Sequence, residues 1–164
     1  MNTDFARNPH IAVKAGALLF ALWGLLHIWV GFEGTTRFLS GDIKYFWQMV
    51  IGGSASPTSS FVYPFEPTTV FANRHLLENF VVDVAGYGVL GFFVAWGLWT
   101  KSSWFAYLIG FIAIGIADLT FLFVMVLSGV TELNFASLAG PAIWVLAVAI
   151  TPFGLRATGE PRQG

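Results

Sequence analysis

The chain has 164 residues, of which 56% are hydrophobic and only 10% are charged, and its formal net charge is −1. Soluble domains carry about a quarter charged residues, so this composition excludes an ordinary water-exposed surface. It also lacks the clustered Lys and Arg of a nucleic-acid-binding surface, so no nucleic-acid partner is expected. Cysteine is absent, which excludes disulfides, thiolate nucleophiles and thiolate metal ligands. The composition therefore predicts an integral membrane protein in a lipid bilayer.

Four apolar runs follow one another along the chain. They cover residues 11–32, 76–100, 102–128 and 135–155. Each is at least as long as the roughly 20 residues that a helix needs to cross the hydrocarbon core. The first run is too long for a signal peptide and has no small-x-small cleavage site after it, so we expect a retained helix. The pattern predicts an all-α fold: one membrane domain, a four-helix transmembrane bundle.

The segment between the first two runs, residues 33–73, is predicted as a long outer loop. Within SGDIKYFWQMVIGG, apolar side chains recur at helical spacing, Ser40 is a candidate N-cap, and Gly52 with Gly53 is a stop signal. This predicts a short amphipathic helix over 42–51, which lies on the membrane surface or caps the bundle. The rest of the loop carries several aromatic residues. A loop of this length is commonly a lid or a docking surface, although it could simply cover the helix ends.

Basic residues are unevenly divided between the two sides of the predicted bundle. One side carries five: Arg7, Lys14, Lys101, Arg156 and Arg162. The other side carries three, and acidic residues offset them. The positive-inside rule therefore predicts both termini in the cytoplasm of a multi-pass protein, in a bacterial inner (plasma) membrane.

A stripe of polar residues marks the second run. His75, Asn79, Asp83 and Tyr87 recur every four residues, so they lie on one face of a helix. Asp83 stands in the apolar stretch VVDVAGYGVLGFF. A carboxylate in such a place costs roughly 2.5–3.5 kcal/mol or more unless it finds a partner or takes up a proton. The stripe is therefore the first candidate for a functional site.

A second buried acid, Asp118, lies in IGIADLTFLFV in the third run. At 1.5 Å per residue, Asp83 lies about 13 Å from Arg74 and Asp118 about 16 Å from Gly129, residues just outside the outer ends of their runs. His27 in the first run falls in the same outer half. We therefore expect the two aspartates to face one another or a shared cavity, with at least one of them protonated, because no Lys or Arg lies deep in any run.

Three interpretations of these residues remain open. The acids could be structural, forming hydrogen bonds that fix how the helices pack. They could form a ligand or proton site with His27, Asn79 and Tyr87. The third interpretation is a metal or redox site, because His75 and Glu78 have the i, i+3 spacing of helical carboxylate–histidine sites, although only one copy of the motif is present.

The corresponding functions belong to two classes. The first is a non-catalytic subunit or accessory protein of a larger membrane complex, or a homo-oligomer, which docks through the aromatic loop. The second is a membrane-embedded site that binds or transfers a proton, a cation, a quinone or a small polar molecule through the buried Asp and His residues. The pattern selects no particular cofactor and does not decide whether the chain is an enzyme.

Overall fold

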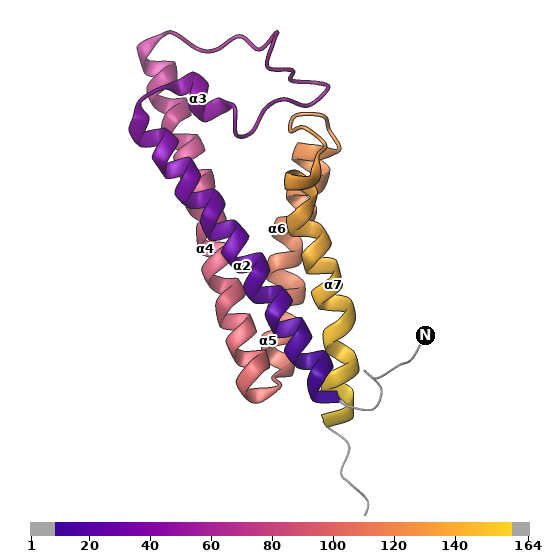
Figure 1. Ribbon diagram of the computed structural model, residues 1–164. Coiled ribbons are helices and arrows are strands. Elements are labelled where there is room, and N and C mark those ends of the chain that lie inside the picture. The colour runs from indigo at the N-terminus through magenta and orange to yellow at the C-terminus, as the bar shows by residue number, and fades with distance from the viewer. Residues whose placement is uncertain (1–8, 159–164) are drawn as a thin grey trace, which may run out of the picture.

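The computed structural model describes residues 9–158, and over these residues it is all-helical (Figure 1). Four helical segments are long and apolar enough to cross a membrane. They are α2 (Pro9–Ser40), α4 (Pro67–Lys101), a third segment over Trp104–Val126 and α7 (Phe135–Thr158). The prediction of an all-α fold with four such helices is thus confirmed. Arg7 and Arg162, used in the orientation prediction, lie outside the described residues.

Two of the helices extend well beyond the predicted runs, so the connecting segment covers 41–66 and not 33–73. α2 continues to Ser40, and an i, i+4 pair supports its last turns, in which Arg37 Nε donates to Glu33 Oε1 at 2.9 Å. α4 begins at Pro67, directly after its N-cap Glu66. Both extensions mix polar and apolar residues, which is why a hydropathy pattern does not reveal them.

The outer connection contains one short helix, α3 (Ile43–Trp47), about half as long as predicted. Its N-cap is Asp42 and not Ser40: Asp42 Oδ1 accepts from the backbone N–H groups of Lys44 and Tyr45. The apolar side of this region packs inward, where Phe46 forms a cluster with α4 residues such as Leu77. α3 therefore packs against the end of α4, as expected for a helix that caps the bundle. Its position on the membrane surface stays a prediction.

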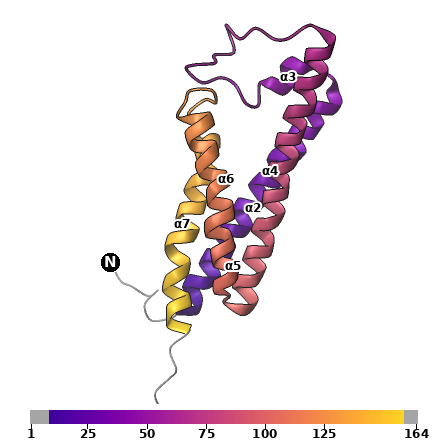
Figure 2. The same cartoon turned by 180° about the vertical axis from the view of Figure 1, so that it is seen from behind.

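α2 occupies the centre of the bundle, with α4 on one side and α7 on the other (Figure 1). Glycines allow the close α2–α4 approach: a Cβ on Gly24 would stand 2.6 Å from the carbonyl oxygen of Gly88. The α2–α4 pair and the pair formed by the third segment and α7 meet at the end that carries Lys101. The pairs diverge toward the outer connection, which we call the loop end (Figures 1 and 2).

The third segment is not a regular α-helix. It runs through α5 (Trp104–Ile109), η1 (Gly110–Ile114), α6 (Gly115–Thr120) and η2 (Phe121–Val126), of which η1 and η2 are π-helical. Trp144 of α7 donates from Nε1 to the carbonyl oxygen of Gly110 at 3.0 Å, at the start of the first π-helical stretch. Such stretches rotate the following side chains relative to a regular helix and are frequent at functional sites. Asp118 lies in the short α-helical stretch between them.

Candidate functional site

The most deeply buried charged residue of the described chain, Asp118, lies where α2, α6 and α7 meet. Only 2% of its surface is exposed. Trp23 and His27, one helical turn apart on α2, both contact Asp118. Gly140 of α7 packs against His27 and Asp118. Two of the predicted site residues, His27 and Asp118, are therefore brought together by the structure.

Each polar atom of this site has a defined neighbour. Trp23 Nε1 donates to Asp118 Oδ2 at 2.8 Å, in a fully buried hydrogen bond. His27 Nε2 lies 3.7 Å from Asp118 Oδ1, the other carboxyl oxygen. His27 Nδ1 lies 2.8 Å from the backbone carbonyl oxygen of Trp23, and the two rings stack with their centroids 3.6 Å apart. Trp23 thus holds both the imidazole and the carboxyl group.

This geometry determines where protons can lie. A carbonyl oxygen only accepts hydrogen bonds, so His27 Nδ1 must carry a proton in order to bond Trp23. Trp23 Nε1–H only donates, so Asp118 Oδ2 is an acceptor. One further proton then fits between His27 Nε2 and Asp118 Oδ1, on either atom. Without it, a lone pair would face a carboxylate in apolar surroundings, which is costly.

Gly140 of α7 packs closely against the His27–Asp118 pair. A single Cβ on Gly140 would stand 3.0 Å from His27 Cε1 and 3.4 Å from Asp118 Oδ1. Gly115, one turn before Asp118, packs against the indole of Trp144 so closely that a Cβ there would lie 2.5 Å from the ring. α6 and α7 are therefore held against the His27–Asp118 pair by glycine contacts.

The expected pairing of Asp83 with Asp118 is wrong. Asp83 is exposed on the surface of α4, and it accepts a hydrogen bond at 2.9 Å from Asn79 Nδ2 on the same helix. Asp118 instead bonds to α2, which packs between α4 and α7. Measured along the helices from the turn that joins α4 to α5, the two aspartates lie at about 27 Å and about 21 Å. The sequence therefore predicted correctly that the two aspartates lie at similar depths. It did not predict that their side chains point in different directions.

The other members of the predicted stripe also stay apart from Asp118. Asn79 and Tyr87 are exposed on the same face of α4 as Asp83. His75 is exposed, and its Nδ1 lies 2.7 Å from the carbonyl oxygen of Phe71. Glu78 is turned toward α2, where it accepts from Thr35 Oγ1 at 3.0 Å. No group of three or more His, Cys, Asp or Glu gathers within residues 9–158, so the structure lends no support to a metal site at His75 and Glu78.

The sequence pattern missed three residues of the site: Trp23, Gly140 and Trp144. Trp23 stands four residues before His27, a spacing at which two side chains on a helix meet. That spacing was the available signal, but tryptophan in an apolar run is more often a packing residue or part of an interfacial belt. For Gly140 the signal was its place before Pro141 in the fourth run, but its contact with His27 and Asp118 depends on how α7 packs against α2.

Comparison of the chain with protein-family models, with curated proteins and with solved structures gives no match. Assignment therefore depends on the fold and the site. Four apolar helices of spanning length indicate a multi-pass membrane protein. Within it, Trp23, His27 and Asp118 form a buried polar site.

Proposed function

We propose that this protein spans the membrane four times and that its buried His27–Asp118 pair binds and transfers a proton. The observation that carries the proposal is the placement of His27 Nε2 opposite Asp118 Oδ1, with both remaining polar atoms already engaged by Trp23. A proton that moves between these two atoms leaves the total charge of the site unchanged. Intramembrane Asp and His residues that pair in this way are typical of proton relays.

The packing supports a proton over the other ligands that the sequence left open. A quinone or a small polar molecule needs space for several heavy atoms, whereas on the α7 side even a Cβ on Gly140 would lie only 3.0 Å from His27 Cε1. A metal ion needs several ligands, and Asp118 and His27 are the only candidates in this group of described residues. A proton needs only the two facing lone pairs.

The proposal is tested by infrared difference spectroscopy of the protein in liposomes at a series of pH values. We expect a carboxyl band that appears and disappears with pH and is absent from Asp118→Asn. Trp23→Phe should shift this band, because one carboxyl oxygen loses its hydrogen bond. Glu78→Gln, a change at another carboxyl group in a membrane-spanning helix, is the matched control and should leave the band in place. If no pH-dependent band distinguishes the wild type from Asp118→Asn, the proposal is wrong.

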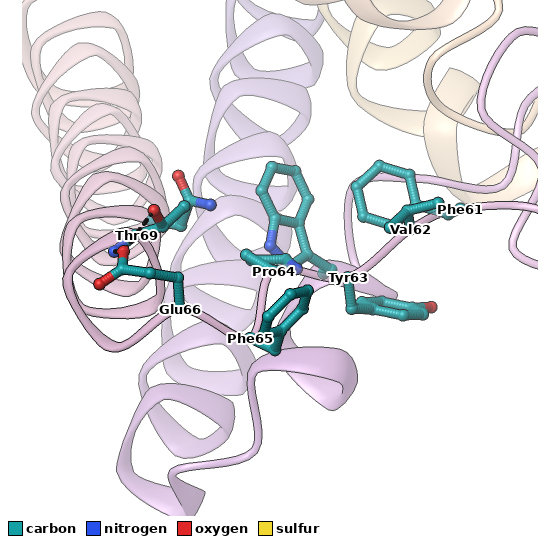
Figure 3. Close-up of a pocket in the computed structure, with 9 residues that line it drawn as sticks. Phe61, Val62, Tyr63, Pro64, Phe65, Glu66 and Thr69 are labelled. Atoms are coloured by element: carbon teal, nitrogen blue, oxygen red, sulfur yellow. Dashed lines mark hydrogen bonds between the residues drawn. The ribbon is translucent and has the colours of Figure 1, made fainter.

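A second function, docking to a larger membrane complex, is supported by the outer connection. Phe65 and Val62 are 91% and 84% exposed, although both are apolar. They lie beside a pocket of about 290 Å³ that Trp47 and Tyr63 also line (Figure 3). Exposed apolar patches rimmed by polar groups commonly mark interaction surfaces.

The docking function predicts a partner that depends on this surface alone. A protein that co-purifies with the wild type in mild detergent should be lost from Val62→Ser/Phe65→Ser and retained by Asp118→Asn. Equal recovery of the same partner with all three proteins would remove the loop surface as the docking site.

For orientation, we propose that the Lys101 end faces the cytoplasm. The described basic residues at that end are Lys14, Lys101 and Arg156. At the loop end, acidic residues balance the basic ones, so the positive-inside rule favours the Lys101 end as the cytoplasmic one. The loop end then faces the opposite side of the membrane.

A further inference from the structure

A row of polar residues lies on an exposed face of α4, outside the His27–Asp118 site. Asn79, Asp83 and Tyr87 are all exposed, and the hydrogen bond of Asp83 within residues 9–158 comes from Asn79 on its own helix. A Cβ on Gly86, which lies on the same side, would meet nothing within 4 Å. A carboxylate is thus exposed on an uncovered face of a helix that would cross the membrane.

Helical periodicity shows where this face points. Asp83 and Val94 are eleven residues apart, about three turns, so their side chains leave α4 in nearly the same direction. Val94 points to the third segment, since its Cγ1 would lie 2.9 Å from a Cβ on Gly110. Asn79 and Gly97 are about five turns apart, and a Cβ on Gly97 would lie 2.8 Å from that of Ala106. The polar residues therefore face the side of α4 on which the third segment packs near Lys101 and diverges toward the loop end (Figure 2).

The contacts between α2 and α4 give the level of Asp83 relative to the proton site. Gly31 packs on Ala85 and on the carbonyl of Val81, so Asp83 lies level with Gly31. His27 is one turn further from the loop end, about 5–6 Å along the axis. Of the pair, His27 is the more accessible: 19% of its side chain is exposed, against 3% for Asp118.

From these positions we infer that Asp83, oriented by Asn79, is the access point through which protons from the loop end reach His27. This inference rests on the proposed function. When the pair has lost its proton, a protonated Asp83 transfers one to His27 Nε2 through the Tyr87 hydroxyl and water. Asp83 then returns to the carboxylate, and His27 becomes the imidazolium that faces Asp118. One proton moves, and the total charge of Asp83, His27 and Asp118 is unchanged.

Two other carboxyl groups of α2 and α4 near the loop end are engaged elsewhere. Glu78 is turned toward Thr35 of α2, and Glu33 is paired with Arg37 at 2.9 Å. Asp83 is thus the carboxyl group on this face that lies closest in level to His27.

The inference is tested by the rate at which the Asp118 infrared band responds to a pH jump applied to liposomes. Asp83→Asn should slow the response by about 100-fold, the low end of what positioned proton-transfer groups contribute, and should leave its final amplitude unchanged. Asp83→Glu should restore most of the rate, because a carboxyl group is present again. Glu78→Gln, a carboxyl change on another face of α4, should respond like the wild type.

Three results are decisive. An Asp83→Asn rate equal to that of the wild type overturns the access role and leaves the proton pair standing. A changed amplitude with an unchanged rate also overturns it, because Asp83 would then affect binding and not access. If the Asp118 band of the wild type does not respond to pH at all, the proposed function fails, and the access role fails with it.

Discussion

The hydrogen bond from Trp23 to Asp118 makes a quantitative prediction about stability. Trp23→Phe keeps a buried aromatic ring but removes the Nε1–H group that donates to Asp118 Oδ2 at 2.8 Å. A buried acceptor left without its partner costs about 1–3 kcal/mol. Interhelical polar pairs measured in membranes lie lower, at about 0.6 kcal/mol on average and about 1.7 at most. Because Asp118 is 2% exposed, we expect a coupling near the upper end, about 1–2 kcal/mol.

The assay is a double-mutant cycle of Trp23→Phe and Asp118→Leu, with the free energy of unfolding measured by reversible denaturation in mixed micelles. The packing lost on changing an indole to a phenyl ring contributes to both sides of the cycle and cancels. What remains is the hydrogen bond. Trp23→Phe should therefore cost less in the Asp118→Leu background than in the wild type, by the coupling energy.

A coupling below about 0.3 kcal/mol, the level at which independent sites are additive, would refute this reasoning. In that case Trp23 would stabilise the site by packing alone, and there would be no basis for treating Asp118 Oδ2 as the acceptor of its N–H group.

Further predictions concern packing, capping and topology. Gly24→Ala should destabilise the protein by about 1–3 kcal/mol in the same assay, because the added Cβ would clash with the Gly88 carbonyl oxygen. Gly86→Ala is the control: its Cβ would have no atom within 4 Å, so the change should be neutral or slightly stabilising. Equal effects of the two changes on the free energy of unfolding would contradict the close α2–α4 contact. Backbone N–H donation from Thr68 and Thr69 lowers the pKa of Glu66 to about 2. This carboxylate therefore supports the start of α4 fully above about pH 4.5 and loses that effect as the pH falls through 2; a carboxyl ¹³C titration of Glu66 with a midpoint near 4.5 would show that the cap is not formed. A topology reporter at Lys101 should report cytoplasm and one at Ser59 the opposite side, and a cytoplasmic signal from Ser59 would reverse the proposed orientation.

Much of the fold was accessible from the sequence because helices of spanning length consist of long apolar runs. The helix ends were less accessible. The Glu33–Arg37 pair and the Glu66 cap stabilise turns that hydropathy assigns to a loop, since both depend on local side-chain bonds and not on apolar content. The length of α3 was overpredicted because Val50 and Ile51 have helical spacing but pack in the turn that follows it.

The candidate site was accessible only in part, for a geometric reason. A buried Asp and a buried His can be found by their cost in an apolar run, which singled out Asp118 and His27. Which acid meets the histidine depends on how each helix is rotated about its axis. That rotation comes from the glycine contacts between helices and from the π-helical stretches η1 and η2, which change the periodicity on either side of Asp118. Asp83 has a similar depth but faces away from α2.

The central claim is that His27 carries a fixed proton on Nδ1 and an exchangeable one between Nε2 and Asp118. It is tested most directly by ¹⁵N solid-state NMR of histidine-labelled protein in liposomes, with the His27 signals assigned by their loss in His27→Gln. We predict that Nδ1 is protonated at every pH, whereas the Nε2 signal changes with pH, and that Asp118→Asn alters this change. A neutral His27 that carries its proton on Nε2 and leaves Nδ1 bare would contradict the account.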